Sequence, residues 1–289
     1  MKSKLAIIII ISLAISFNSC SQKEITSNMN IIFLHHSTGS AIWGTPTLAS
    51  RAVGKLIDKK LSYRFYKRSS LPLLLSRYNR KNNKDYFIRE MSFPKPVPYG
   101  WHNYPYDYYN IWVKNAGNEP FMEEPTLEIL TKEYQVIIFK HCFPVGNIQA
   151  DQDSSDINSD FKSVANYRLQ YLALKNKLHE FPDTKFIIFT GAALVKGNVS
   201  EDEAIRAKKF FRWVTEEWDE PGDNIYLWDL YKLQTEGGLY FRDEYAVSPD
   251  NSHPNSAFAG YAANLLFNRI IDVIENEGAK TKVTGEKIE

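Results

Sequence analysis

The sequence predicts an α/β fold in which a parallel β-sheet carries helices on both of its faces. Four short apolar segments rich in Ile, Val and Phe, each bounded by polar or turn residues, occur at residues 30–34, 135–140, 185–190 and 224–228. Strands that are buried on both faces of a parallel sheet have this composition. Helical patterns lie between these segments, and such alternation with short connections is typical of a sheet between two layers of helices.

Three helices are predicted from apolar periodicity and from capping residues. Residues 161–180 follow the cap candidates Ser159 and Asp160 and end before Pro182, and residues 201–218 form the second helix. The third begins near Ser256, and one apolar stripe runs along it, formed by Phe258, Ala262, Leu265, Leu266, Ile270, Val273 and Ile274. Residues 63–66 are a candidate for a further strand.

The domain is expected to span residues 30–278 and to carry an irregular insertion. The stretch of about 69–124 is the least regular and is rich in prolines, so we interpret it as an insertion of long loops beside the site; its prolines include Pro94, Pro96, Pro98 and Pro105. The polar tail, residues 279–289, is expected to fray.

Length and composition fit one soluble globular domain. The 289 residues are 44% hydrophobic and 24% charged, and the formal net charge is +1 with no long run of one sign. This balance gives no electrostatic reason to propose nucleic acid as a partner. The sequence does not indicate an oligomeric state.

The N-terminus has the pattern of an export signal. Lys2 and Lys4 precede an apolar run at residues 5–17, which is too short for a membrane span and is typical of a secretory signal. Cys20 follows a small residue at the end of this run and resembles a bacterial lipoprotein processing site. The resemblance implies a signal peptide at 1–19, lipid on the Cys20 sulfur and a tether at 20–29. It therefore also implies an exported protein of the cell envelope that faces the periplasm or the cell surface. The alternative is a plain signal peptide with an unmodified cysteine.

Only one other cysteine is present, so no disulfide framework is expected. If Cys20 carries lipid, Cys142 has no partner. We interpret Cys142 as a small buried apolar residue rather than a nucleophile.

Ser37 is the candidate nucleophile. The first predicted strand runs into His35, His36 and Ser37, which places the serine at the carboxyl edge of the sheet, where active sites of open α/β sheets lie. A helix that begins there would direct free N–H groups at the oxyanion of a tetrahedral intermediate. The alternative is a purely structural role, in which Ser37 caps the helix.

A histidine near the other end of the chain supplies the base that such a serine needs. Asp250 and His253 lie three residues apart between Pro249 and Pro254, just before the last predicted helix. This spacing lets the carboxylate reach the imidazole and hold it in one tautomer. We therefore predict a triad of Ser37, His253 and Asp250, although Asp250 could also be a turn residue at the helix entry.

These residues resemble the conserved blocks of the SGNH (GDSL-like) hydrolase family. Asp250-x-x-His253-Pro-Asn resembles the last block, which carries the catalytic Asp and His, and Ser37 falls where the nucleophile falls. The usual Gly-Asp-Ser is here His35-His36-Ser37. The resemblance implies a three-layer α/β/α sandwich with a flavodoxin-like parallel sheet.

The same resemblance implies where the oxyanion hole lies. Asn115-Ala116-Gly117 resembles the second block, whose glycine N–H serves this hole together with the N–H of Ser37. The third block, usually Gly-x-Asn-Asp, falls near residues 141–144 and departs from that pattern. Asn147, or less favourably His141, is the candidate for the missing side-chain donor.

An aromatic stretch at residues 99–112 is the candidate substrate surface. Rings with polar edges, such as Trp101 and Tyr104, suit stacking on sugars, although the same rings could simply pack the insertion onto the domain. His36 and His141 are candidates for lining the pocket, and packing is again the alternative. A zinc site from His35, His36 and His141 is conceivable, but no acidic or cysteine ligand cluster supports it, so we expect no metal and no cofactor.

The sequence thus predicts hydrolysis of an O-acyl ester through an acyl-enzyme on Ser37. The family resemblance implies an acylated small molecule, a lipid or a carbohydrate as substrate, and the aromatic stretch favours an acylated glycan. Two alternatives remain. The same triad serves an acyltransferase if a sugar hydroxyl replaces water, and a lipoprotein that has lost catalysis could bind glycans without cleaving them.

Overall fold

A computed structural model describes residues 28–44, 71–100 and 103–288. The predicted signal peptide, the Cys20 lipidation site, most of the tether, the strand candidate at 63–66 and Trp101 lie outside the described residues. Within the described residues, no helix combines the length and the apolarity that a membrane span needs.

The core is one five-stranded parallel sheet in the order β2-β1-β3-β4-β5. The prediction of a flavodoxin-like sheet is confirmed, because this is the order of that doubly wound fold. Strands β1, β3, β4 and β5 correspond to the four predicted apolar segments, and their inward side chains are almost wholly buried. The strands are β1 (Met29–His35), β2 (Tyr86–Ser92), β3 (Val136–Phe139), β4 (Lys185–Phe189) and β5 (Ile225–Trp228).

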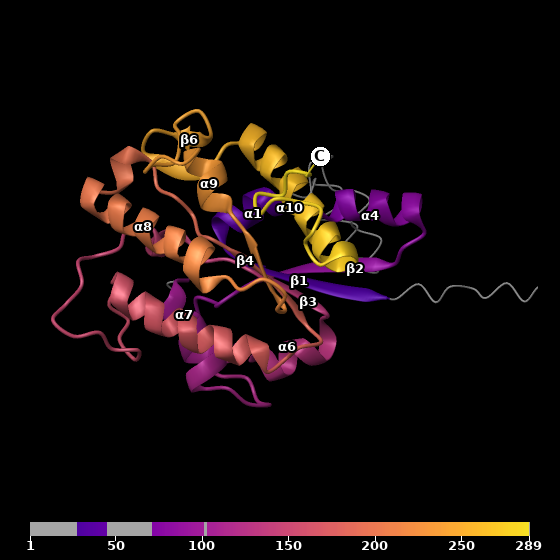
Figure 1. The fold of residues 1–289 in the computed structure, drawn as a ribbon, viewed down its shortest axis with the longest axis horizontal. Helices are drawn as coiled ribbons and strands as arrows, with labels where there is room; N and C mark the ends of the chain where they lie inside the picture. The colour runs from indigo at the N-terminus through magenta and orange to yellow at the C-terminus, as the bar shows by residue number, and fades with distance from the viewer. Residues whose placement is uncertain (1–27, 45–70, 101–102, 289) are drawn as a thin grey trace, which may run out of the picture.

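Helices cover both faces and complete a three-layer sandwich. Figure 1 shows α10 and α4 on one side of the sheet and α6 and α7 on the other. Helix α1 packs with α4 and α10, whereas α7 packs with α5, η2 and α8. The helices are α1 (Ser37–Trp43), α4 (Leu71–Asn82), α5 (Pro105–Tyr109), η2 (Asn110–Lys114), α6 (Leu127–Glu133), α7 (Val164–His179), α8 (Glu201–Trp213), η5 (Val214–Trp218), α9 (Leu230–Thr235) and α10 (Ser256–Asn276).

The three long predicted helices are confirmed, and polar side chains cap each of them, although the first begins at Val164 and not at 161, so the cap candidates Ser159 and Asp160 are wrong. Ser163 accepts a hydrogen bond from the backbone of Asn166 at the start of α7. Ser200 and Glu203 form a capping box on α8, and the side chain of Asn255 caps α10. Because these caps end the preceding loops sharply, they fix where each helix leaves the carboxyl edge of the sheet.

The region predicted as an irregular insertion instead supplies part of the core. It contains helix α4 and edge strand β2, which pairs in parallel with β1 along its whole length. In this edge strand the first three residues are buried, whereas in the second half half-buried residues such as Arg89 alternate with exposed ones such as Glu90. It therefore lacks the continuous apolar run by which the other strands were recognised.

The C-terminal tail is anchored rather than frayed, contrary to expectation. Thr281 and Thr284 are buried, and the indole N–H of Trp228 donates to the Thr284 carbonyl at 3.0 Å. The backbone N–H of Asp229 donates to the Val283 carbonyl at 2.9 Å. The tail thus packs on edge strand β5.

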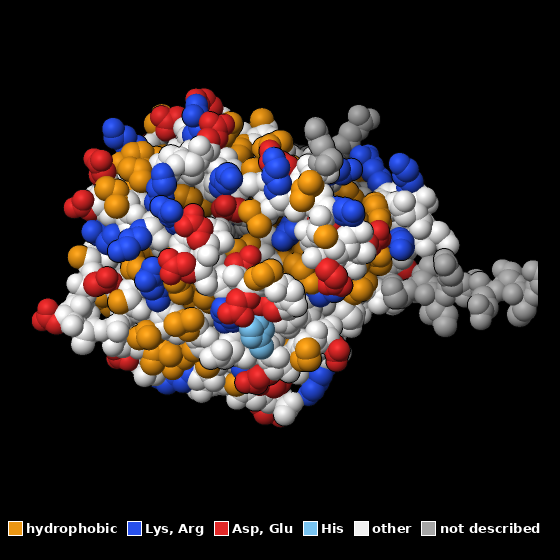
Figure 2. Space-filling view, in the orientation of Figure 1, with side chains coloured by type: hydrophobic (Ala, Val, Ile, Leu, Met, Phe, Trp, Pro, Cys, Tyr) orange, Lys and Arg blue, Asp and Glu red, His pale blue; other side chains and the backbone are white. Residues whose placement is uncertain are grey.

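Before α10 the chain forms a short antiparallel hairpin of β6 (Ala246–Ser248) and β7 (Asn251–Pro254). The view in Figure 2 shows positive and negative side chains interspersed, with no large area of one sign.

Candidate active site

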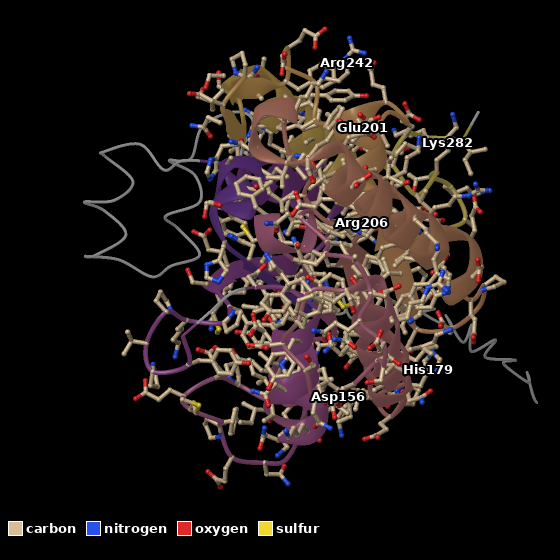
Figure 3. The ribbon with its side chains drawn as sticks, turned by 90° about the vertical axis from the view of Figure 1, so that its left-hand side faces the viewer. Asp156, His179, Glu201, Arg206, Arg242 and Lys282 are labelled. Atoms are coloured by element: carbon tan, nitrogen blue, oxygen red, sulfur yellow. The ribbon has the colours of Figure 1, made fainter. Side chains whose placement is uncertain are left out.

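Ser37 lies where the sequence places it, at the carboxyl edge of the sheet. Strand β1 ends at His35 and α1 begins at Ser37, whose side chain is exposed. His36 is the N-cap residue, so the alternative in which Ser37 caps the helix is wrong. The Ser37 hydroxyl makes a hydrogen bond of 3.6 Å with the thiol of Cys142, which follows β3. Figure 3 looks onto this edge, at which α8 contributes the labelled Arg206.

His253 lies in a strand that packs against the helix of this serine. It is half-buried in β7, and this strand packs directly against α1. The imidazole meets the ring of Phe143 edge-on, with centroids 4.9 Å apart. Because Phe143 directly follows Cys142, consecutive residues contact His253 and Ser37. Ser37 and His253 are therefore linked through the Cys142–Phe143 segment, and no hydrogen bond joins the two side chains, as is common before substrate binds.

Asn251 fixes the tautomer of His253. Its Oδ1 lies 2.8 Å from Nδ1 of His253 and 3.1 Å from the backbone nitrogen of the same residue. A backbone N–H can only donate, so this atom is the carbonyl oxygen of the amide and Nδ1 must carry a hydrogen. The lone pair of Nε2 is consequently free to accept a proton, as in Cys-His-Asn proteases.

Asp250 does not reach the imidazole, which differs from the predicted triad. It is exposed at the tip of the β6–β7 hairpin, and its carboxylate accepts a short hydrogen bond from the Ser248 hydroxyl. The Asp250 carbonyl accepts from Asn198 at 3.1 Å. The hairpin turn points this carboxylate at its own strand, so the turn-residue interpretation describes Asp250 and the amide of Asn251 takes the orienting position.

The surroundings keep His253 neutral at physiological pH. Burial is the main cause that lowers its pKa below 6.5, and the positive charge of Lys140 lowers the pKa further. A neutral imidazole with a free Nε2 lone pair is the form that a general base requires.

Gly117 cannot serve the oxyanion hole in this arrangement. Its carbonyl accepts from the Thr126 hydroxyl at 2.5 Å, and Glu128, two residues beyond Thr126, forms a 2.6 Å ion pair with Lys177. Lys177 lies at the C-terminal end of α7, just before β4 begins. These residues therefore occupy the amino edge of the sheet, at the opposite end from Ser37.

Asn147 lies at the correct edge but is not joined to the serine. It follows β3, and its side-chain oxygen accepts from Lys162 at 3.0 Å. Its role as an oxyanion donor stays a prediction.

The other predicted substrate residues are packing residues. His36 is buried, and its Nε2–H donates to the Pro94 carbonyl at 2.7 Å; burial lowers its pKa to about 4. His141 is wholly buried against the rings of Tyr108 and Tyr171. Tyr104 is also buried and donates to the Asp160 carbonyl at 2.9 Å. None of these three presents a surface to substrate.

Three residues of the site escaped the sequence analysis: Asn251, Cys142 as a neighbour of Ser37, and Lys140. Lys140 directly follows β3 and is 0% exposed, yet its ammonium nitrogen makes no hydrogen bond. A lysine at the end of an apolar strand, where alternate residues point inward, is the signal that could have identified it. Among the described residues, no group of three His, Cys, Asp or Glu side chains could hold a metal ion.

Comparison with known proteins adds a distant likeness. No protein-family model matches the chain, and no curated protein matches it at a significant level. It is similar to a solved structure of a carbohydrate esterase whose active site is described as having divergent catalytic and non-catalytic binding functions. The two share 16% identity with a TM-score of 0.37, and the match covers 84% of this chain but 65% of that one. A likeness this low carries no argument about chemistry.

Proposed function

We propose that the protein is a serine ester hydrolase of the kind that the SGNH resemblance implies. Ser37 is the nucleophile, His253 is the general base, and Asn251 holds the imidazole. The observation that supports this proposal is the packing of β7, which carries His253, against α1, which begins at the exposed Ser37 at the carboxyl edge.

The proposed reaction has two half-steps. Ser37 Oγ attacks the ester carbonyl while Nε2 of His253 takes its proton, and the imidazolium then protonates the leaving alcohol. Water, deprotonated by the same nitrogen, attacks the acyl-enzyme, and the imidazolium then protonates Ser37 Oγ as its bond to the acyl carbon breaks and the carboxylic acid leaves. The backbone N–H of Ser37, in the first turn of α1, stabilises the oxyanion.

We further propose an exported, lipid-anchored enzyme that acts on acylated carbohydrate or a small acyl ester. The pattern of the first twenty residues supports export and lipidation of Cys20. Burial of Tyr104, Tyr108 and Trp112 removes these rings as a stacking surface, so the glycan substrate rests on the family resemblance.

The test is covalent labelling of Ser37 by a fluorophosphonate, together with hydrolysis of a short aryl ester and of acetylated glycans. Ser37→Ala should abolish labelling and lower hydrolysis by at least about 10³-fold, because the nucleophile is lost. Ser40→Ala is the matched control, since Ser40 is exposed one turn further along α1 and bonds His35 at 3.5 Å.

Retained labelling in Ser37→Ala, or no turnover of any ester by the wild type, would refute the proposal. Product analysis with a sugar acceptor present separates hydrolysis from acyl transfer. Glycan binding that survives Ser37→Ala without any turnover would instead indicate the non-catalytic alternative.

A further inference from the structure

A loop after β4 contacts the hairpin that carries His253. The loop includes the single helical turn η4 (Lys196–Asn198), in which the backbone N–H of Asn198 donates to the Val195 carbonyl at 2.9 Å. Hydrogen bonds join this loop to the β6–β7 hairpin across 52 to 57 residues of chain. The position of His253 therefore depends on a segment that belongs to another part of the sheet edge.

Ser252 is the residue of β7 that faces the loop. Its side chain is 4% exposed, whereas the neighbouring Asn251 is exposed and His253 is half-buried. Successive side chains of a strand point to opposite faces, so Asn251 and His253 share one face while the Ser252 hydroxyl points into the loop. This alternation explains why Asn251 Oδ1 meets Nδ1 of His253. The way in which Ser252 is held therefore decides where both neighbours face.

Three hydrogen bonds form this junction, and each donor meets an acceptor. The backbone N–H of Val195 donates to Ser252 Oγ at 3.0 Å, and the Ser252 hydroxyl donates to Asn198 Oδ1 at 2.7 Å. Nδ2 of Asn198 in turn donates to the Asp250 carbonyl at 3.1 Å. A backbone N–H can only donate and a carbonyl can only accept, so the orientation of the Asn198 amide is fixed. One amide thus binds the residues on both sides of Asn251.

Gly197 allows the loop to lie directly on the hairpin. A methyl group on its Cα would lie 2.9 Å from the carbonyl oxygen of Pro249, which is a backbone atom and not the end of a flexible side chain. Any larger residue would therefore displace the hairpin turn. The two segments consequently form one close contact in which the side chain of Asn198 reaches the backbone of Asp250.

We propose that Asn198 is a positioning residue for His253, because it fixes the chain on either side of Asn251 and so keeps Asn251 against the imidazole. It holds the carbonyl of the residue before Asn251 and the hydroxyl of the residue after it, and Asn251 then holds Nδ1–H. The effect on catalysis rests on the proposed function, whereas the effect on the tautomer of His253 does not.

The decisive experiment follows the tautomer of His253 by nitrogen-15 NMR of the full-length chain labelled at histidine, at a pH at which the imidazole is neutral. His253→Gln identifies the signals of this residue among the six histidines. In the wild type one ring nitrogen should carry the hydrogen and the other none, so the two signals should lie far apart. In Asn198→Ala they should move toward each other, because Asn251 no longer holds Nδ1–H and both tautomers become populated.

Ser248→Ala is the matched control, because this hydroxyl belongs to the same hairpin but bonds the exposed Asp250 carboxylate instead of the loop. It should leave the signals of His253 in place. Unchanged signals in Asn198→Ala, or an equal change in Ser248→Ala, would overturn the proposal. If Asn198→Ala fails to fold, Asn198→Asp decides instead: it sets a carboxylate against the Asp250 carbonyl, and unchanged signals again overturn the proposal.

Ester turnover supplies a second readout through a double-mutant cycle. Asn198→Ala should lower kcat about tenfold and leave KM within about twofold, because a misplaced base slows the chemical step. In an Asn251→Ala background the same substitution should cause no further loss, since Asn198 acts through Asn251. Equal losses in both backgrounds would overturn the proposal. A wild type that turns over no ester would refute the proposed function, yet the NMR result would still decide the role of Asn198.

Discussion

The buried cations Arg269 and Lys140 lie in two regions of the molecule that treat them in opposite ways. Beneath the C-terminal tail, Arg269 is 6% exposed and donates to the carbonyls of Leu227 and Gly278 and to Thr281. Asp272 lies 3.7 Å away and accepts from the backbone of Lys280 and Thr281. At the carboxyl edge of the sheet, Lys140 is more deeply buried and makes no hydrogen bond at all.

The contrast suggests different roles: Arg269 stabilises the fold, whereas Lys140 belongs to the candidate site. A buried charge with every partner in place holds the tail on β5 and α10, whereas an unsatisfied one costs stability and persists for another reason. His141 shows the same condition as Lys140, since both of its ring nitrogens lack partners and burial lowers its pKa to about 3. Two consecutive unsatisfied side chains, Lys140 and His141, therefore follow β3 at the edge that carries Ser37.

The largest expected effect is on stability and comes from breaking the hydrogen-bonded network around Arg269. Asp272→Ala leaves Arg269 as an uncompensated buried charge and removes the acceptor for the backbone of the tail. It should lower the free energy of unfolding by about 3–5 kcal/mol, measured by urea denaturation of the purified chain.

Glu216→Ala provides the control for this prediction. It breaks an ion pair with Arg212 of 2.8 Å, but both side chains are largely exposed, so the unfolding midpoint should not move measurably. Equal losses in the two variants would show that the tail network does not stabilise the fold.

The sequence predicted the features that have local signals and missed those that depend on tertiary structure. Strands β1, β3, β4 and β5 and the long helices were predictable because continuous apolar runs and caps are local signals. Strand β2 was not, because an edge strand exposes alternate polar side chains such as Arg89. The positions of Ser37 and His253 in the fold were predictable, because one follows a strand end and the other precedes a helix start; their catalytic roles stay predictions.

The orienting group of His253 could not be predicted, because the turn decides it. Asp250 and Asn251 are adjacent, and which side chain faces the imidazole depends on the bend of the β6–β7 hairpin. The place of Gly117 could not be predicted for a related reason: a short motif does not show at which edge of the sheet its loop ends.

Separate substitutions of Asn251 and Asp250 test which of the two side chains orients His253. Asn251→Ala removes the acceptor that holds Nδ1–H, so ester turnover should fall by about 10²-fold while the fold remains intact. Asn251→Asp keeps an acceptor and should preserve most of the turnover. Asp250→Ala should change turnover by less than about threefold, since its carboxylate contacts Ser248 and not His253. The reverse ranking would restore Asp250 as the triad member.

The smallest expected effect concerns the acidic limb of the pH–rate profile. His253 acts as a base only when neutral, and burial holds its pKa below 6.5, so turnover should persist at pH 6.5 and fall only as His253 becomes protonated at lower pH. Phe143→Ala removes a ring that packs on the imidazole and should move this limb upward, toward the ordinary histidine value. Phe181→Ala, in the turn before β4 at the amino edge, should leave the limb in place. A limb that does not move in Phe143→Ala would mean that the Phe143 ring does not set the protonation of His253.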